Sequence, residues 1–406
     1  MTAITEAEGR DQVAGLVEKF TANRTFYKTA AYKETATRAQ FIDPFFRALG
    51  WDVTDADGRG PSREVLLENL HRSEAELAGS EDWDEDLTAE ELAERTAVLM
   101  FPDYVFRLDF IKKFVTEAKK PSVDLHSKVP TFQAKSYGWS MGVAVAVLTD
   151  FEAFRVFDAR FKPAYGRPND AILDDLDLTC DQYVAEWPRI WSLLSRDAVL
   201  GGSLDQLVAP RRGTMAVDKS LVTELLRWRG ELAQELLTRN PTLTRFDLAE
   251  ATQRILDRLV FIRIMEDRGI LGERLLRRHA RLTDSYAHMV PVFHQLDVIY
   301  NGQIFAPHFS DQLTISDSVI QRIVSELQPP APYRFDGLPT DVLGSIYERF
   351  LGQEIVVEGS SATLEDKLEV RHAGGVYYTP RWVAEHIVDR VLSPLLAGKT
   401  RAPSRI

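Results

Sequence analysis

Strand-like sequence is concentrated between residues 102 and 160 of this chain, and this concentration limits the fold more than any other feature. Four runs rich in β-branched and aromatic residues occur there as two pairs, separated by residues 130–141, whose apolar spacing is helical. Helical spacing over residues 8–48, ended by Gly50, and a short strand start at 51–53 come before them. This order predicts a mixed α/β domain, in which helices flank a mixed sheet. The four runs are DYVFRLDF, KKFVTEAK, VAVAVLTD and AFRVFDAR.

Downstream of about residue 170 the strand-like runs stop, and apolar residues recur at helical spacing. We therefore expect an α/β domain over residues 1–165 and an all-helical connector domain over 166–335. The remaining residues, 336–406, are expected to form helices on either side of a polar loop, 357–374. The acidic segment 59–98 is interpreted as a helical connection or insertion.

The composition excludes several classes of protein. Of the 406 residues, 45% are hydrophobic and 27% are charged, which is typical of a soluble globular chain with two or three domains. No apolar run is long enough to cross a bilayer, and the single cysteine, Cys180, excludes a disulfide framework or a multi-cysteine zinc site. These features predict a cytoplasmic protein with no membrane partner. The net charge of −12 does not exclude DNA binding, because a DNA footprint depends on where the charge lies.

The stretch FVTEAKKP, residues 114–121, contains the first candidate site. Glu117 and Lys119 are two residues apart, so on a strand both side chains lie on the same face. Pro102 and Asp103 open the preceding strand-like run, and antiparallel pairing of the two runs would bring Asp103 beside Glu117. Adjacent carboxylates repel each other unless a cation lies between them, and Mg²⁺ prefers such oxygen ligands. The alternative interpretation is a salt-bridged pair on a solvent-exposed face.

Three further residues extend this pattern. Gln133 and Tyr137 are four apart on the predicted helix that follows the strand, and therefore lie on one helix face. Glu34 lies on the predicted helix that precedes the sheet. With the aspartate and the Glu-x-Lys pair, these residues resemble the PD-(D/E)xK nuclease superfamily, in its branch with a Q-x-x-x-Y helix. In that resemblance Glu34 is an additional candidate metal ligand; Asp43 and Glu64 compete for the role, and an ordinary exposed helix position is the alternative.

The resemblance implies a role for each matching residue. Asp103 and Glu117 would bind Mg²⁺, and Lys119 would be the catalytic lysine. Gln133 and Tyr137 would support the site or the DNA. The implied activity is metal-dependent hydrolysis of phosphodiester bonds in double-stranded DNA.

Residues 371–388, RHAGGVYYTPRWVAEHIV, carry a second motif. Thr379 and Pro380 suit the cap and the first turn of a helix. The string from Gly375 to Pro380 also resembles the segment that begins the methyltransferase domain of amino-adenine DNA methyltransferases, where it lines the S-adenosylmethionine pocket. The sequence contains no N-P-P-[YF] motif to hold a flipped adenine, so we expect S-adenosylmethionine to serve only a full-length enzyme. The implied cofactor-binding residues are Tyr377, Tyr378, Thr379 and Pro380.

The order of these parts is similar to that of the type IIG restriction–modification enzymes, including type IIL, which carry nuclease, helical connector, methyltransferase and target-recognition domains on one chain. We expect this chain to be the N-terminal portion of such a phage-defence enzyme, a type II site-specific deoxyribonuclease that ends where the methyltransferase domain begins. Without the recognition domain, weak or nonspecific nicking is expected. The alternative is a catalytically inactive nuclease-fold module that binds DNA or a partner methyltransferase. The oligomeric state stays open, and a transient dimer would serve double-strand cleavage.

Overall fold

The structure of the chain is a computed structural model. No helix among the residues it describes is both long enough and apolar enough to cross a membrane. The predicted acidic segment is described only up to residue 67, and the motif at 375–380 lies outside the described residues. The described ranges are 4–67, 102–108, 110–208, 216–271, 275–300, 302–328, 331–338 and 352–366, with single residues between 344 and 391.

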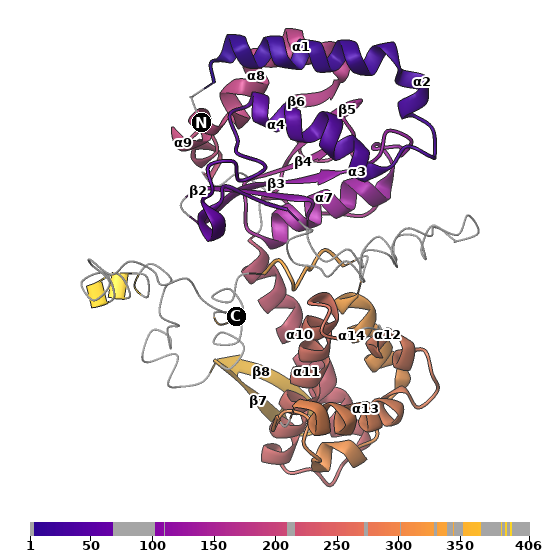
Figure 1. Ribbon diagram of the computed structural model, residues 1–406. Coiled ribbons are helices and arrows are strands. Elements are labelled where there is room, and N and C mark those ends of the chain that lie inside the picture. The colour runs from indigo at the N-terminus through magenta and orange to yellow at the C-terminus, as the bar shows by residue number, and fades with distance from the viewer. Residues whose placement is uncertain are drawn as a thin grey trace. The chain divides into compact units, whose positions relative to one another are not determined.

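A six-stranded sheet forms the centre of the N-terminal part, and its strands lie in chain order from β1 to β6 (Figure 1). Every neighbouring pair is antiparallel except β3 and β4, which are parallel. A parallel pair needs a crossover connection, and helix α7 (Lys128–Ser140) supplies it. The sheet is therefore mixed, as predicted. The strands are β1 (Val65–Leu67), β2 (Tyr104–Leu108), β3 (Ile111–Ala118), β4 (Val145–Thr149), β5 (Ala153–Asp158) and β6 (Ile172–Thr179).

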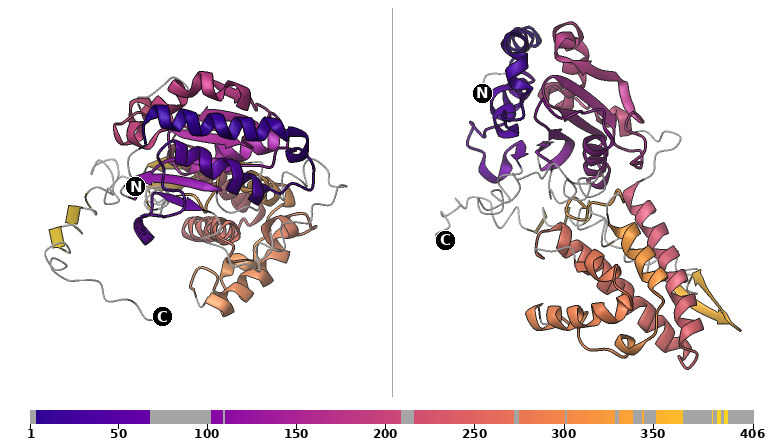
Figure 2. Two further views of the ribbon diagram at one scale, coloured as in Figure 1. Left: turned by 45° about the horizontal axis from the view of Figure 1, so that its top comes forward. Right: turned by 90° about the vertical axis from the view of Figure 1, so that its right-hand side faces the viewer.

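Helices cover both faces of this sheet, because successive strand residues point to opposite sides. On one face, Phe114 and Val145 belong to a large buried cluster shared with helices α1 (Glu6–Ala22), α4 (Asp43–Ala48) and α8 (Tyr183–Leu194). On the other face, the neighbouring residues of β3 and β4 pack on α7 in a second cluster. Figures 1 and 2 show α1 and α4 as a layer beside the strands, with α7 on the opposite side. Short helices α2 (Arg24–Tyr27), α3 (Glu34–Thr37), η1 (Arg38–Ile42) and α9 (Arg196–Leu200) complete this part.

Helix α7 packs closely on the sheet at Gly138, where there is no room for a side chain. A Cβ atom at Gly138 would lie 2.7 Å from the Cβ atom of Ala159 and 2.9 Å from that of Ala146. Real Cβ atoms do not approach so closely, because the packed interior has no room to relax. Three small residues therefore determine how near α7 can bring its side chains to β3 and β4.

Several predicted elements differ from the structure. Residues 51–53 are not a strand. The first strand is β1, which lies within the segment 59–98, so the prediction that this segment is helical was wrong for residues 65–67. The prediction that the chain is helical from about residue 170 was wrong for β6, which pairs with β5 and extends the sheet beyond residue 165. β6 reads ILDDLDLT, in which carboxylates stand between apolar residues, and its three leucines are buried in the core on the sheet. Helix α8, expected in the connector, instead contributes Tyr183 and Trp187 to the core on the sheet.

The chain divides into two compact units, and helix α11 (Arg245–Asp267) contributes residues to both. The first unit comprises Met1–Val217, Asp257–Asp311 and Ser316–Leu338. After the sheet, this unit is helical, and the buried Arg258 in its α11 portion pairs with Asp311 at 2.5 Å. Its other helices are α12 (Leu275–Ala280), α13 (Ser285–Tyr300) and α14 (Asp317–Leu327).

The second unit comprises Asp218–Leu256, Gln312–Ile315 and Pro339–Ile406, and contains most of helix α10 (Val217–Arg239). It also contains a two-stranded hairpin of β7 (Gln353–Glu358) and β8 (Ser361–Asp366). The hairpin docks on α10: the Gln234 side chain donates to the Ser360 carbonyl at 3.0 Å and accepts from the Ala362 amide at 2.9 Å. The prediction of helix followed by a polar loop was therefore wrong for residues 353–366.

Candidate active site

The pairing of β2 with β3 brings the two predicted carboxylates together. Tyr104 pairs with Thr116 in the antiparallel register, so Asp103, the residue before β2, lies opposite Glu117. The Oδ2 atom of Asp103 accepts a hydrogen bond from the backbone amide of Ala118 at 2.7 Å. Asp103 and Glu117 are 3% and 2% exposed, so neither carboxylate lies on a solvent face. Their predicted adjacency is confirmed, and the solvent-face alternative is wrong.

Lys119 also lies at this site. Its backbone amide donates to the Thr149 carbonyl at 2.9 Å, which continues the pairing of β3 with β4 by one residue. This extended backbone directs the ammonium group to the Glu117 side, where Nζ lies 2.6 Å from Oε1 of Glu117. The predicted common face of Glu117 and Lys119 is therefore confirmed, and both side chains are buried.

Burial and neighbouring charge perturb this pair strongly. Burial raises the pKa of the Glu117 carboxyl to about 8, and the charges of Asp103 and Glu34 add to the increase although Lys119 opposes it. Burial would lower the pKa of the Lys119 ammonium, but the carboxylates of Glu117, Glu34 and Asp103 raise it above its ordinary value. The site thus concentrates negative charge in a buried place, where an additional cation would be stabilised.

Arg38 is a member of the site that the sequence analysis missed. It lies in η1 and is 9% exposed; its Nη1 donates to Oδ1 of Asp103 at 2.7 Å and its Nη2 to the Asp103 carbonyl at 3.3 Å. Its guanidinium also lies 4.8 Å from the centroid of the Tyr104 ring. A sequence signal existed, because Arg38 follows Glu34 by four residues, the spacing of neighbours on one helix face. Arg38 holds the Asp103 carboxylate in one orientation.

The three carboxylates considered for an additional ligand have different surroundings. Glu34, the first residue of α3, is half-buried and acts electrostatically on both Glu117 and Lys119. Asp43 accepts a hydrogen bond from the Tyr104 hydroxyl at 2.6 Å. Glu64 forms ion pairs with two arginines, Arg59 and Arg196. Of the three, Glu34 is the one whose charge acts on the Glu–Lys pair.

Gln133 and Tyr137 lie one turn apart on α7, and both are buried. The Tyr137 ring packs in the cluster between α7 and the sheet, beside Val115. Its hydroxyl accepts a hydrogen bond from Arg334 at 3.2 Å, and Arg334 is itself within electrostatic reach of Glu117. Neither amide atom of Gln133 has a hydrogen-bond partner among the described residues. The shared helix face is confirmed, whereas a catalytic role for either residue stays a prediction.

The donor set can be tested against Mg²⁺. No cluster of three or more His, Cys, Asp or Glu side chains suited to a metal occurs in the described part of the chain. Mg²⁺, however, often takes only one or two carboxylates together with waters and substrate phosphate. Oε2 of Glu117 is buried and has no hydrogen-bond partner in the part of the chain that the structure describes, and such an atom is costly unless something else satisfies it. The carboxylate oxygen of Glu117 is therefore the atom of this set that is open to a magnesium ion, whereas both oxygens of Asp103 already accept hydrogen bonds.

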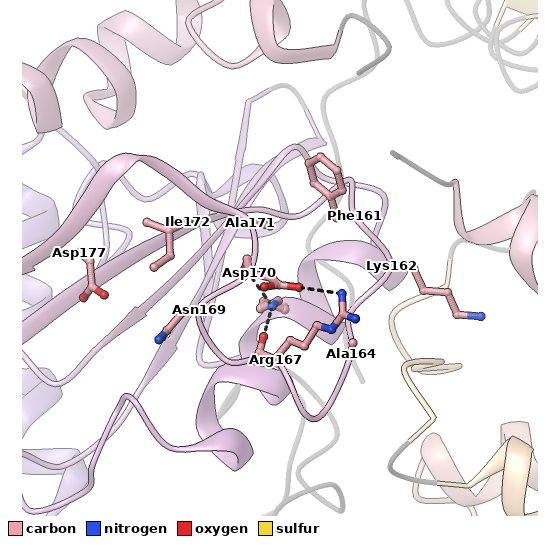
Figure 3. Close-up of a pocket in the computed structure, with 10 residues that line it drawn as sticks. Phe161, Lys162, Ala164, Arg167, Asn169, Asp170, Ala171, Ile172 and Asp177 are labelled. Atoms are coloured by element: carbon pink, nitrogen blue, oxygen red, sulfur yellow. Dashed lines mark hydrogen bonds and ion pairs between the residues drawn. The ribbon is translucent and has the colours of Figure 1, made fainter. Parts of the chain in front are cut away.

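A cavity of about 740 Å³ lies at another part of the same domain (Figure 3). Lys135 of α7 lines it, and its ammonium donates to the carbonyls of Arg167 and Asp170 at 3.1 and 3.0 Å. Burial lowers the pKa of Lys135 to about 8. These bonds join the β5–β6 connection to α7. None of the carboxylates discussed above lines the cavity, so it is separate from the candidate site.

Comparison with known proteins places this geometry in context. No family model matches the sequence, and no solved structure matches it. A curated protein of Escherichia coli, "Type II restriction enzyme and methyltransferase RM.Eco57I", is 28% identical over 400 residues. The match covers 96% of this chain and 38% of that protein, so the chain spans well under half of its relative's length. The chain is therefore homologous, over nearly its whole length, to part of a fused type II restriction enzyme and methyltransferase.

Proposed function

We propose that this chain is the endonuclease portion of a restriction–modification enzyme and hydrolyses DNA phosphodiester bonds with Mg²⁺ through a PD-(D/E)xK site. The observation that carries the proposal is the buried arrangement of Asp103 opposite Glu117, with Lys119 at 2.6 Å from the Glu117 carboxylate. Homology to part of a restriction enzyme supports DNA as the substrate. A solvent-exposed ion pair would not explain why three ionisable side chains are buried together.

Each residue has a task in this proposal. Asp103 and Glu117 would hold Mg²⁺, and Arg38 keeps the Asp103 carboxylate oriented. When bound, Mg²⁺ supplies Lewis acidity that eases deprotonation of an attacking water and offsets charge on the phosphate. Lys119 remains charged because the surrounding carboxylates raise its pKa. An ammonium has three hydrogens to donate, so Lys119 can bind Glu117 and still orient a water or a phosphate oxygen.

The C-terminal motif belongs to a different activity. Tyr377, Tyr378, Thr379 and Pro380 would contact S-adenosylmethionine in a longer enzyme, and this chain alone would not methylate DNA. Target recognition would likewise come from parts of a longer enzyme, since the match covers only 38% of the relative. The chain should therefore cut or nick DNA with low sequence preference.

The proposal is tested with supercoiled plasmid DNA and Mg²⁺ or Mn²⁺, with a chelator as the blank. Glu117→Gln and Lys119→Met should each reduce cleavage by at least about a hundredfold, because each removes a charge at the reacting phosphate. Lys135→Met is the matched control, since Lys135 is also a buried lysine of this domain but lines the separate cavity. Equal cleavage by wild type and both site variants would refute the assignment.

One observation favours a second candidate, an inactive nuclease fold that only binds DNA or a methyltransferase partner. Both carboxylate oxygens of Asp103 already accept hydrogen bonds, from Arg38 and from the Ala118 amide. If these hydrogen bonds prevent Asp103 from binding a metal ion, the chain would bind DNA but would not cut it in the presence of any divalent cation. A gel-shift assay run beside the plasmid assay separates the two candidates, because binding without cleavage supports the second.

A further inference from the structure

The segment 331–338, which follows α14, lies against the C-terminal end of α7. The backbone amide of Arg334 donates to the Ser140 hydroxyl at 3.0 Å, and that hydroxyl donates to the Pro332 carbonyl at 3.1 Å. The Tyr333 ring packs against Trp139 with centroids 5.6 Å apart. These contacts join residues almost 200 positions apart in the sequence, within one compact unit.

The side chain of Arg334 continues the contact towards the candidate site. Its Nη2 donates to the Tyr137 hydroxyl at 3.2 Å, and its guanidinium lies 4.8 Å from the centroid of the same ring. Arg334 is 4% exposed, so both interactions occur away from water, where they are stronger. Tyr137 is fully buried and has the β3 residue Val115 in its cluster. Arg334 thus holds the tyrosine that packs beside the strand carrying Glu117.

Arg334 is itself held from helix α11. The amide of Phe335 donates to Oδ2 of Asp267 at 2.9 Å, and Asp267 pairs with Arg263 at 2.5 Å. Arg263 also donates to the Leu327 carbonyl at the end of α14 at 2.9 Å. The helical region therefore determines where the guanidinium lies, and a continuous series of contacts runs from α11 through this segment to α7.

We propose that Arg334 is a positioning residue of the nuclease site, and that cleavage requires segment 331–338 to be docked on α7. The inference rests on the proposed nuclease function. Arg334 covers the ring of Tyr137 on α7, and α7 packs on β3 and β4 next to the Asp103–Glu117 pair. Arg334 adds a buried positive charge within electrostatic reach of Glu117. The helical region would in this way control whether the site is assembled.

The first test compares two buried arginines that each lie over an aromatic ring. Arg334→Met removes the charge, the hydrogen bond to Tyr137 and the 3.6 Å ion pair with the buried carboxylate of Asp336. Arg258→Met is the matched control, because the Arg258 guanidinium also lies 4.8 Å from an aromatic centroid, that of Phe293, and is fully buried. We expect Arg334→Met to lower the single-turnover cleavage rate at saturating protein about tenfold while leaving DNA affinity unchanged, since misplacement affects the reacting geometry more than binding. Arg258→Met should leave the single-turnover rate near that of the wild type.

A double-mutant cycle with Tyr137→Phe shows whether Arg334 acts through Tyr137. If it does, the double variant should cut no more slowly than Arg334→Met alone, and the unfolding free energies should also be non-additive. Arg334→Lys, which keeps the charge, should fold and recover part of the rate. A cleavage rate of Arg334→Met equal to that of the wild type would overturn the inference. Fully additive effects of the two substitutions on both the cleavage rate and the unfolding free energy would also overturn it. If the wild type does not cleave DNA, the proposed function is wrong. The double-mutant cycle on the unfolding free energy needs neither DNA nor metal, so it would still show whether Arg334 and Tyr137 are coupled.

Discussion

The buried carboxyl of Glu117 should give this protein a pH-dependent stability that Glu117→Gln removes. The pKa of Glu117 is raised from 4.5 to about 8, so between these pH values the folded state retains a proton that the unfolded state has lost. Stability contributed by this group is therefore fully present below pH 4.5 and decreases as pH rises towards 8. The difference of 8 − 4.5 = 3.5 pH units sets a ceiling of ~5 kcal/mol, at ~1.4 kcal/mol per unit.

The assay is thermal unfolding of wild type and Glu117→Gln from pH 5 to pH 8.5 without divalent cations. The substitution also leaves Lys119 without its closest partner, which lowers stability at every pH. The diagnostic quantity is therefore how the difference in Tm between wild type and Glu117→Gln changes with pH. Even a third of the ceiling, about 1.5 kcal/mol, would move the relative Tm by about 2–3 °C in favour of Glu117→Gln across this range. Thr116→Val is the control, because it changes a buried, non-titrating neighbour on the same strand. Parallel curves for wild type and Glu117→Gln would refute the reasoning.

Other substitutions test the site and the packing around it. Millimolar Mg²⁺ at pH 8 should raise the Tm of the wild type but not that of Glu117→Gln, because an ion stabilises the folded state only if it binds to it. Equal shifts in both proteins would contradict the assignment of Glu117 as a metal ligand. Gly138→Ala should lower the unfolding free energy by about 1–3 kcal/mol through overpacking against the sheet, whereas Gly15→Ala, with open space around its Cβ position, should be neutral or stabilising in denaturant titrations. Arg38→Met should lower the free energy of unfolding by about 3–5 kcal/mol, because it leaves the buried Asp103 carboxylate without its ion-pair partner. Arg24→Met breaks a more exposed ion pair and should lower it by about 1 kcal/mol or less. Similar losses in the two variants would argue against a stabilising buried pair.

Local sequence spacing was sufficient to predict the central part of the site. Glu117 and Lys119 share a face because strand side chains alternate, and Asp103 faces Glu117 because two short consecutive runs form an antiparallel pair. These relations depend on residues within a few positions or on one hairpin. The mixed sheet followed from the same kind of evidence.

Other features could not be read from local patterns. β6 has carboxylates between its apolar residues and few β-branched ones, so its strand state comes from pairing with β5. The partner of Asp103 is Arg38, 65 positions away, and periodicity indicates only that Arg38 shares a helix face with Glu34. The hairpin on α10 was missed for the same reason, since its position depends on contacts over more than 120 residues.

Local patterns were enough to predict the strand and helix order around the site, the common face of Glu117 and Lys119, and the spacing of Gln133 and Tyr137. The folded chain was needed to show that the carboxylates are buried, that Arg38 orients Asp103, and that Arg334 covers Tyr137 from 197 positions away. The physical reason is that periodicity reports which way a side chain faces within its own element. Burial, ion pairing and the pKa of Glu117 depend on what other elements place against that face.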